Sequence, residues 1–459
     1  MKITNISFLL LFIFAILLST LIVNKYDKYE ISSDYKNNHT MIKGDAYKYW
    51  NEAQEIKKQN KNEVPFYKLG LSYYQSFLPP KLISAFYIVI SEDLFLNEYT
   101  DDNRLKVKSN NKKNYFFNLQ IITFFISLLI LLRSLKKNYF EISIICIFFL
   151  IIEPTINQFH YAFFTESFFF SLTMLLMAQI IINSNRKINA FLIGITIGVM
   201  YLQRSVAILY FVPVLFFFIL EKKSFKFYFS YLLGLSLIIS FIGFHNYQRA
   251  GLIYFTPFQS KQDLFIYLIP NVAKEKNTKQ SELEVNEIKN KMLIFKKNNN
   301  LDLKSEKDLI TYGTYLRKLS VIYIINNPIP TIKVMIKKSL HALILNPFEI
   351  HSFYKYEYKS ANPQFRYYKS EAHKKNLKIR IFYSAIFYLV CLIGLYAMST
   401  KKKNINFLIY LVLSILYFTS IAGWVGNPRY LTPNIIFLSI FFAFGFLELK
   451  KKLLENLKL

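Results

Sequence analysis

The chain has 459 residues, of which 53% are hydrophobic and 18% aromatic. Apolar runs long enough to cross a hydrocarbon core about 30 Å thick recur along it, which excludes a soluble globular domain and predicts an all-α polytopic membrane protein. The formal charge of +28 would suggest nucleic-acid binding in a soluble protein. Here much of the Lys and Arg falls in short loops and at the ends of apolar runs, where topology and contact with membrane lipids explain it, so no nucleic-acid partner is predicted.

The apolar runs predict about ten transmembrane helices, the first of them an uncleaved span because no small-residue cleavage site follows it. These spans are residues 5–23, 115–132, 139–156, 161–182, 189–203, 205–220, 226–244, 379–398, 405–422 and 431–447. With the N-terminus inside, alternate connections are cytoplasmic and each carries Lys or Arg, as the positive-inside rule requires. The sequence therefore predicts a multi-pass protein of the cell (inner) membrane.

The predicted spans divide the chain into three parts. Residues 1–244 form an N-terminal membrane core, and its first outer loop, 24–114, is expected to hold short interfacial helices and the acidic residue Asp45. Residues 245–378 form an extracytoplasmic loop and subdomain, and residues 379–459 contain the C-terminal transmembrane helices. Outer loops above roughly 60 residues translocate largely regardless of their charge, so the basic character of these loops is compatible with the topology.

Two segments of the outer part have helical patterns without being spans. Residues 271–318 are polar with apolar residues at helical spacing, which predicts a small helical subdomain on the surface. Residues 329–346 are moderately apolar but are interrupted by Lys333, Lys337 and Lys338. This pattern predicts an interfacial amphipathic helix beneath the outer subdomain rather than a crossing.

The apolar run 189–220 is short for two full crossings and long for one. A single crossing would move Lys222 and Lys223 to the outside, so two short helices that break at residues 203–205 are predicted. Because irregular backbone at membrane depth is tolerated only where it is buried in protein or lines a water-filled cavity, the region of Arg204 is a candidate wall of a pocket.

With this threading, charged and polar groups gather on the outer side, at span ends or in outer loops. They are Asp45, Glu153, His160, Glu166, Arg204, His245, Arg249 and Arg429. Each also has a plainer interpretation: the acids can cap helices, and a lone Arg can extend to lipid headgroups. The two histidines lack a third spaced ligand, so no metal site is predicted.

The order of several short motifs resembles the GT-C superfamily of membrane glycosyltransferases, in particular the branch related to protein mannosyltransferases (glycosyltransferase family 39) and lipid A aminoarabinose transferases. The motifs are Asp45 followed by Tyr49 and Ala53, Pro154 with Thr165–Ser167, Gly198–Arg204 with Pro213, Asn246–Tyr247 with Gly251, Asn327–Pro328, and Arg429–Tyr430 with Pro433. The chain departs from the family at Ala46, where a second acid is common, and at His245, where an Arg is common. These departures leave the donor and the acceptor open.

The resemblance implies transfer of a sugar from a polyprenyl phosphate donor to a hydroxyl of a lipid, glycan or protein acceptor on the extracytoplasmic side. Asp45 would be the catalytic base, and Arg204, Arg249 and Arg429 would hold the leaving phosphate. The remaining substrate-binding residues would be Tyr49, Glu166, His245, Asn246 and Tyr430. No cofactor is assigned, and assistance by a divalent cation stays an alternative.

Two other functions fit parts of the pattern. A lipid-linked glycan polymerase or ligase also combines many spans with a large outer loop, and its key residues would fall in 245–378 rather than at Asp45. A transporter or flippase of lipid-linked sugars would carry charges at mid-span depth and show repeat symmetry, neither of which the sequence displays.

Overall fold

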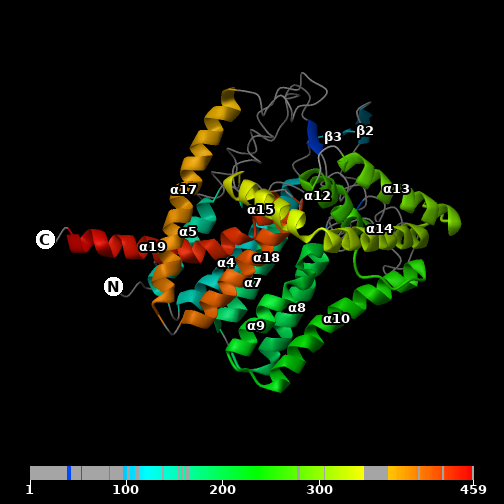
Figure 1. The fold of residues 1–459 in the computed structure, drawn as a ribbon. Coiled ribbons are helices and arrows are strands. Elements are labelled where there is room, and N and C mark those ends of the chain that lie inside the picture. Colours follow the sequence, from blue (N-terminus) through cyan, green and yellow to red (C-terminus); the bar gives the residue numbers. More distant parts are fainter. Residues whose placement is uncertain are drawn as a thin grey trace.

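The fold is described from a computed structural model and is predominantly helical (Figure 1). The residues that the structure describes are 39–42, 53, 82, 97–100, 104–108, 113–136, 139–153, 156, 159–160, 165–182, 184–276, 280–303, 305–345, 371–401, 404–425 and 428–456. Asp45 and Tyr49, and the predicted first span at 5–23, lie outside them.

Among the described residues, four helices are long and apolar enough to cross a membrane, which confirms the prediction of a helical multi-pass membrane protein. They lie within α4 (Lys113–Lys136), α10 (Phe225–Ala250), α17 (Glu371–Ser399) and α18 (Ile405–Val425). On α10, apolar side chains at spacings of three and four residues stay uncovered: Phe229, Leu233, Leu237, Phe241 and Phe244. Such a stripe on a helix that packs on its other face is what a lipid-facing span requires.

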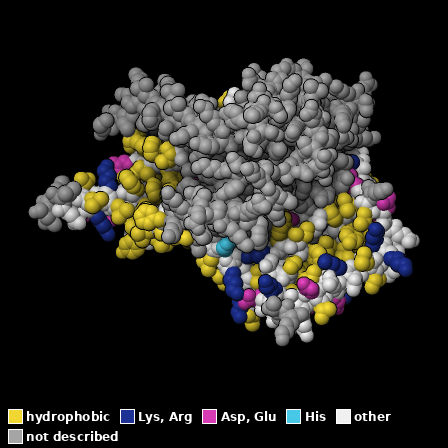
Figure 2. All heavy atoms as spheres, turned by 90° about the horizontal axis from the view of Figure 1, so that it is seen from above, with side chains coloured by type: hydrophobic (Ala, Val, Ile, Leu, Met, Phe, Trp, Pro, Cys, Tyr) yellow, Lys and Arg dark blue, Asp and Glu magenta, His cyan; other side chains and the backbone are white. Residues whose placement is uncertain are grey.

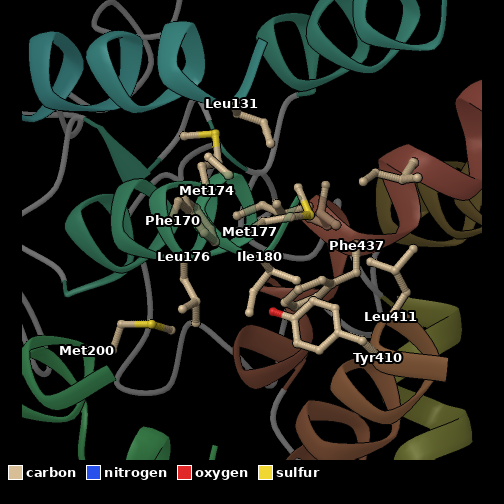
Figure 3. Packing of buried hydrophobic residues seen from close by; sticks show 14 of the residues in the cluster. Leu131, Phe170, Met174, Leu176, Met177, Ile180, Met200, Tyr410, Leu411 and Phe437 are labelled. Atoms are coloured by element: carbon tan, nitrogen blue, oxygen red, sulfur yellow. The ribbon is translucent and has the colours of Figure 1, made fainter. Parts of the chain in front are cut away.

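Shorter apolar helices pack between these spans. They are α5 (Phe140–Ile152), α7 (Glu166–Ile182), α8 (Lys187–Gln203), α9 (Phe211–Leu220) and the apolar part of α19 (Asn434–Asn456). Their shared core is filled with aromatic and sulfur-containing side chains, and Figure 3 shows Met177 and Ile180 of α7 beside Tyr410 of α18 and Phe437 of α19. This core is largely apolar even though lipid surrounds the bundle, so close packing rather than exclusion from water is what selects it.

The predicted break in the run 189–220 is confirmed. Helix α8 ends at Gln203, Arg204 has extended backbone angles (φ −147°, ψ 120°), and the short 3-10 helix η3 (Ser205–Leu209) leads into α9. Gly194 of α8 lies against Leu235 of α10, and Gly198, one turn later in α8, lies against Ile238, which is also later in α10. Helices α8 and α10 are therefore parallel, and α9 returns between their ends.

Hydrogen bonds define the two ends of this bundle. At one end, the loops that contain Lys and Arg lie together. Side chains far apart in sequence form hydrogen bonds there: Tyr139 with Asn404, Asn406 with Glu221, and Lys223 with Asn185. The other end is tied by Gln203 to Thr165 and by Ser205 to Ser260. The loops predicted to be cytoplasmic thus lie together, and the break at Arg204 lies at the opposite end.

Two glycine contacts allow the closest helix crossings. A Cβ on Gly194 would lie 2.2 Å from the carbonyl oxygen of Tyr231 in α10, and a Cβ on Gly394 of α17 would lie 1.8 Å from that of Phe441 in α19. Small residues at such positions let helix backbones approach in a bilayer, where van der Waals packing drives association.

We expect Gly394→Val to lower the stability of the purified protein by about 1–3 kcal/mol, because the added side chain overlaps backbone atoms that cannot move away locally. Thermal unfolding in detergent measures the change. Leu392→Val, at an exposed position two residues away, serves as the control. Equal unfolding temperatures for the two variants would contradict the close crossing of α17 and α19.

The part between α10 and α17 forms a helical subdomain, as predicted for 271–318. Its elements are α11 (Phe258–Asp263), the π-helical turn η4 (Leu264–Leu268), α12 (Ile269–Lys276), α13 (Ser281–Asn298) and α14 (Glu306–Asn326). In the view of Figure 2, charged side chains are interspersed with apolar ones over the side of the molecule where α13 and α14 lie. Apolar side chains dominate near α17 and α19.

The segment predicted as an interfacial helix is α15 (Pro328–Leu345), which bends by 100° from α14. It packs on α18, where the Ser339 hydroxyl donates a hydrogen bond to the carbonyl of Thr419 at 3.1 Å. An uncovered apolar row follows its outer face: Ile329, Ile332, Ile336 and Leu340. Its lysines face the subdomain, since Lys337 forms an ion pair with Glu275 at 2.7 Å. These two faces are those of an amphipathic helix.

The first outer loop contains a small sheet that the sequence analysis did not anticipate. Strands β1 (His39–Ile42), β2 (Asn97–Thr100) and β3 (Arg104–Lys108) pair antiparallel in the order β1-β3-β2. Each strand has only four or five residues, so even the alternation of polar and apolar residues in β3 is too short to predict a strand. Because β1 pairs with β3, the two ends of the loop meet, and Asp45 follows β1 by three residues.

Candidate functional site

The buried centre of the polar end is an ion pair between Glu166 and Arg204. The Arg204 Nη1 lies 3.2 Å from the Glu166 Oε1, and the two side chains are 6% and 0% exposed. Glu166 is the first residue of α7, where a carboxylate is favoured by the helix dipole, and Arg204 is held in place by the break after α8. The pairing compensates two charges that would otherwise be costly to bury.

Aromatic rings enclose the guanidinium of Arg204. Its Cζ lies 5.0 Å from the centre of the Tyr430 ring and 5.6 Å from that of Phe169. Phe169 in turn meets Phe418 of α18 edge to face. Cation–π contacts of this kind contribute about 0.5–2 kcal/mol each, with the larger values in desolvated places. Rings from α7 and from the segment before α19 thus contact this arginine, and α18 packs behind Phe169.

Neighbouring polar groups orient the pair. The Gln203 side-chain amide donates to the carbonyl of Thr165 at 3.0 Å, and the Thr165 hydroxyl donates to Glu166 Oε2 at 3.2 Å. The start of α7 is therefore fastened to the end of α8. Just beside it, Nδ1 of the buried His160 lies 2.7 Å from the hydroxyl of Ser167. Glu166 thus has an oriented carboxylate rather than a freely rotating one.

A second ion pair closes the end of α10. Arg249 contacts both the Glu306 carboxylate at the start of α14 and the Tyr254 hydroxyl. The Asn246 side chain donates to the carbonyl of Tyr254 at 2.6 Å. Between them Gly251 ends the helix with a left-handed backbone (φ 66°), a conformation that disfavours other residues. This cluster connects the longest described span with the outer subdomain.

The structure brings some of the predicted residues together and leaves others apart. Glu166, Arg204 and Tyr430 form one contact group, whereas Asn246 and Arg249 belong to the second ion-pair cluster. His245 is buried in the same turn of α10 as Asn246. The backbone of Arg429 lies in the 3-10 helix η7 (Pro428–Leu431), next to Tyr430, but its side chain is outside the described part.

A further predicted residue, Glu153, has a local structural role. The buried Glu153 accepts a hydrogen bond from the backbone N–H of Ile156 at 3.1 Å, which caps the turn after α5. Within the described ranges, no three His, Cys, Asp or Glu side chains are grouped so as to hold a metal ion.

Sequence reasoning missed Glu306 and Lys261. Both lie in polar stretches that have no distinguishing motif, and only the approach of α11 and α14 to the ends of α8 and α10 gives them partners.

The described site can hold positive charge in a desolvated place and can position polar groups at one end of a bundle. No known protein-family model matches this chain, and no curated protein matches it in sequence. A function for this chain is therefore proposed from the chemistry of its residues.

Proposed function

We propose that the protein is a GT-C-like membrane glycosyltransferase that moves a sugar from a polyprenyl phosphate to a hydroxyl acceptor on the extracytoplasmic side. The observation that carries the proposal is the buried Glu166–Arg204–Tyr430 group at the end of the bundle opposite the basic loops. A structural helix end has little need of an ion pair enclosed by rings, whereas a site for a charged lipid-linked substrate needs oriented charge at membrane depth.

In the proposed reaction the acceptor hydroxyl oxygen attacks the anomeric carbon of the sugar. The bond from that carbon to the phosphate oxygen breaks, and polyprenyl phosphate leaves with the electron pair. Asp45, in the first outer loop, takes the proton of the hydroxyl as general base. The leaving group is a stable anion that needs positive charge more than a proton, and Arg429 is the proposed source of that charge.

The two paired arginines have a positioning role in this proposal. Arg204 and Arg249 each face a glutamate, so their charges are already partly balanced. They keep the break after α8 and the end of α10 in fixed places, as a preorganised site requires. Tyr49, His245, Asn246, Tyr430 and Arg429 remain the proposed contacts to sugar and lipid. The shorter apolar helices and the run 5–23 are proposed to cross the membrane too, giving about ten spans.

Reconstitution tests the function directly. The purified chain, placed in liposomes with a panel of radiolabelled polyprenyl phosphate sugars, is expected to move label into an added lipid, glycan or peptide acceptor. The Asp45→Asn variant in the same liposomes is the negative control. Label that crosses the bilayer on its original lipid, with no transfer, would instead identify a flippase. Extension of a lipid-linked glycan by whole repeat units would identify a polymerase.

A further inference from the structure

Among the described residues, Lys261 is a buried cation without a counter-charge. It lies in α11, its residue is 7% exposed, and its ammonium makes one hydrogen bond, to the Thr314 hydroxyl of α14 at 2.9 Å. No carboxylate lies within ion-pair distance of it in the part of the chain that the structure describes. Its stem crosses α14 at Gly313, where a Cβ would lie 3.2 Å from the Lys261 Cδ. The ammonium is thus held in place by a neutral hydroxyl and by the packing of its stem.

A second cation and an unused hydroxyl lie close to Lys261. Arg317, one turn beyond Gly313 on α14, interacts electrostatically with both Lys261 and the Tyr201 phenol of α8. Arg317 also has no ion pair among the described residues. The Tyr201 side chain is buried, and its hydroxyl has no hydrogen-bond partner there. The buried Lys261, the exposed Arg317 and the buried Tyr201 hydroxyl are therefore three possible donors to an anion near the place where α11 approaches α14 and the end of α8.

The charge balance of this cluster differs from that of the rest of the site. Burial, and then the repulsion from Arg317, lower the pKa of Lys261 to about 8. Since the folded state disfavours the charged lysine, the empty cluster destabilises the fold below the usual lysine pKa near 10.4. Arg204 and Arg249 by contrast each have a glutamate beside them. Among the described residues, no carboxylate plays the same part beside Lys261.

We propose that Lys261, Arg317 and the Tyr201 hydroxyl bind the phosphate group of a lipid-linked substrate. The cluster adjoins the break after α8, because Ser260, next to Lys261, hydrogen-bonds Ser205, next to Arg204, at 2.7 Å. Lysine and arginine together with a hydroxyl are suited to phosphate oxygens, since charged donors make the strongest hydrogen bonds to them. The identity of the lipid-linked substrate rests on the proposed function, but the anion site itself does not.

Binding in nanodiscs tests the inference without any sugar transfer. The full chain is placed in phosphatidylcholine nanodiscs and titrated with farnesyl phosphate, with farnesol as the uncharged match. We expect Lys261→Gln and Arg317→Gln each to weaken farnesyl phosphate binding by about tenfold or more, which corresponds to the loss of one charge-assisted contact. Lys318→Gln, an exposed neighbour on α14, should bind as the unchanged protein does, and farnesol binding should not respond to any variant.

A stability measurement separates binding from a purely structural lysine. Without ligand, Lys261→Gln should unfold at the same or a higher temperature, because a buried uncompensated charge is removed. Farnesyl phosphate should raise the unfolding temperature of the unchanged protein and leave that of Lys261→Gln in place. A Lys261→Gln variant that is less stable and still binds farnesyl phosphate normally would overturn the proposal.

The pH dependence and a competing lipid complete the test. Binding to the unchanged protein should weaken as pH rises above about 8, where Lys261 loses its proton, and Lys261→Gln should lack this dependence. Nanodiscs that contain phosphatidylglycerol distinguish the two sources of phosphate. Displacement of farnesyl phosphate by phosphatidylglycerol in proportion to its amount would assign the cluster to bulk lipid headgroups and overturn the substrate assignment. Persistent binding would support it, even if the transfer assay failed.

Discussion

Asp45→Asn is expected to reduce the rate of sugar transfer by about 10²–10⁴-fold, the usual contribution of a general base. Asparagine has nearly the same shape as aspartate but cannot accept the proton of the attacking hydroxyl. An acid in an outer loop contributes little to packing of the spans, so the amount of protein in the membrane should not change. Initial rates with a radiolabelled polyprenyl phosphate sugar, normalised to the amount of protein in the liposomes, measure the effect.

Asp101→Asn is the matched control, because it removes an acid from the same outer loop. It is expected to transfer sugar at the unchanged rate. Full activity of Asp45→Asn would refute the base assignment. Activity that survives this change but is lost through changes in 245–378 would favour the polymerase or ligase alternative, whose key residues belong to the late outer loop.

Arg204→Gln is expected to lower the free energy of unfolding by about 3–5 kcal/mol, because it leaves the Glu166 carboxylate buried without its partner. The loss of the contacts with the Tyr430 and Phe169 rings adds to this effect. Unfolding in detergent, followed by tryptophan fluorescence or by heat, gives the change. Arg186→Gln, an exposed arginine at the other end of the same helix, is expected to shift stability little.

The double variant Glu166→Gln with Arg204→Gln isolates the charge effect. Since both charges are gone, it is expected to be more stable than Arg204→Gln alone. In transfer assays it should still be impaired, because the positioning of the helix ends depends on the pair. A double variant as unstable as the sum of the two single variants would show that the ion pair is not the stabilising interaction.

Patterns of hydrophobicity predicted the parts of the fold that depend on local sequence. The break at Arg204 follows from a run too long for one crossing and too short for two ordinary ones, and the structure has it at that residue. The amphipathic helix 329–346 follows from three lysines in an apolar run, and α15 has the expected two faces. In both cases the length and composition of one segment determine the outcome.

Contacts between distant segments could not be predicted in this way. Glu306 and Lys261 lie in ordinary polar stretches, and their partners Arg249 and Thr314 are 57 and 53 residues away. The strands of the first loop have only four or five residues, and the alternation of Arg104–Lys108 is too short to distinguish it from a loop. The order of the motifs in the sequence indicated Glu166, Arg204 and Tyr430 of the candidate site. Lys261 and Arg317, which have no counter-charge among the described residues, could be recognised only from the fold.

The 100° bend between α14 and α15 has a consequence for how often the chain crosses the bilayer. Helix α10 finishes at the end of the bundle that holds Arg249, and α17 must start there, since its last residues meet the lysine-bearing loops. In the proposed threading the intervening stretch leaves and re-enters on the same side, so its number of crossings is even. One crossing made jointly by α14 and α15 would be an odd number, and residues 346–370 are too polar to add a second one. Parity therefore argues against a single joint crossing by these two helices.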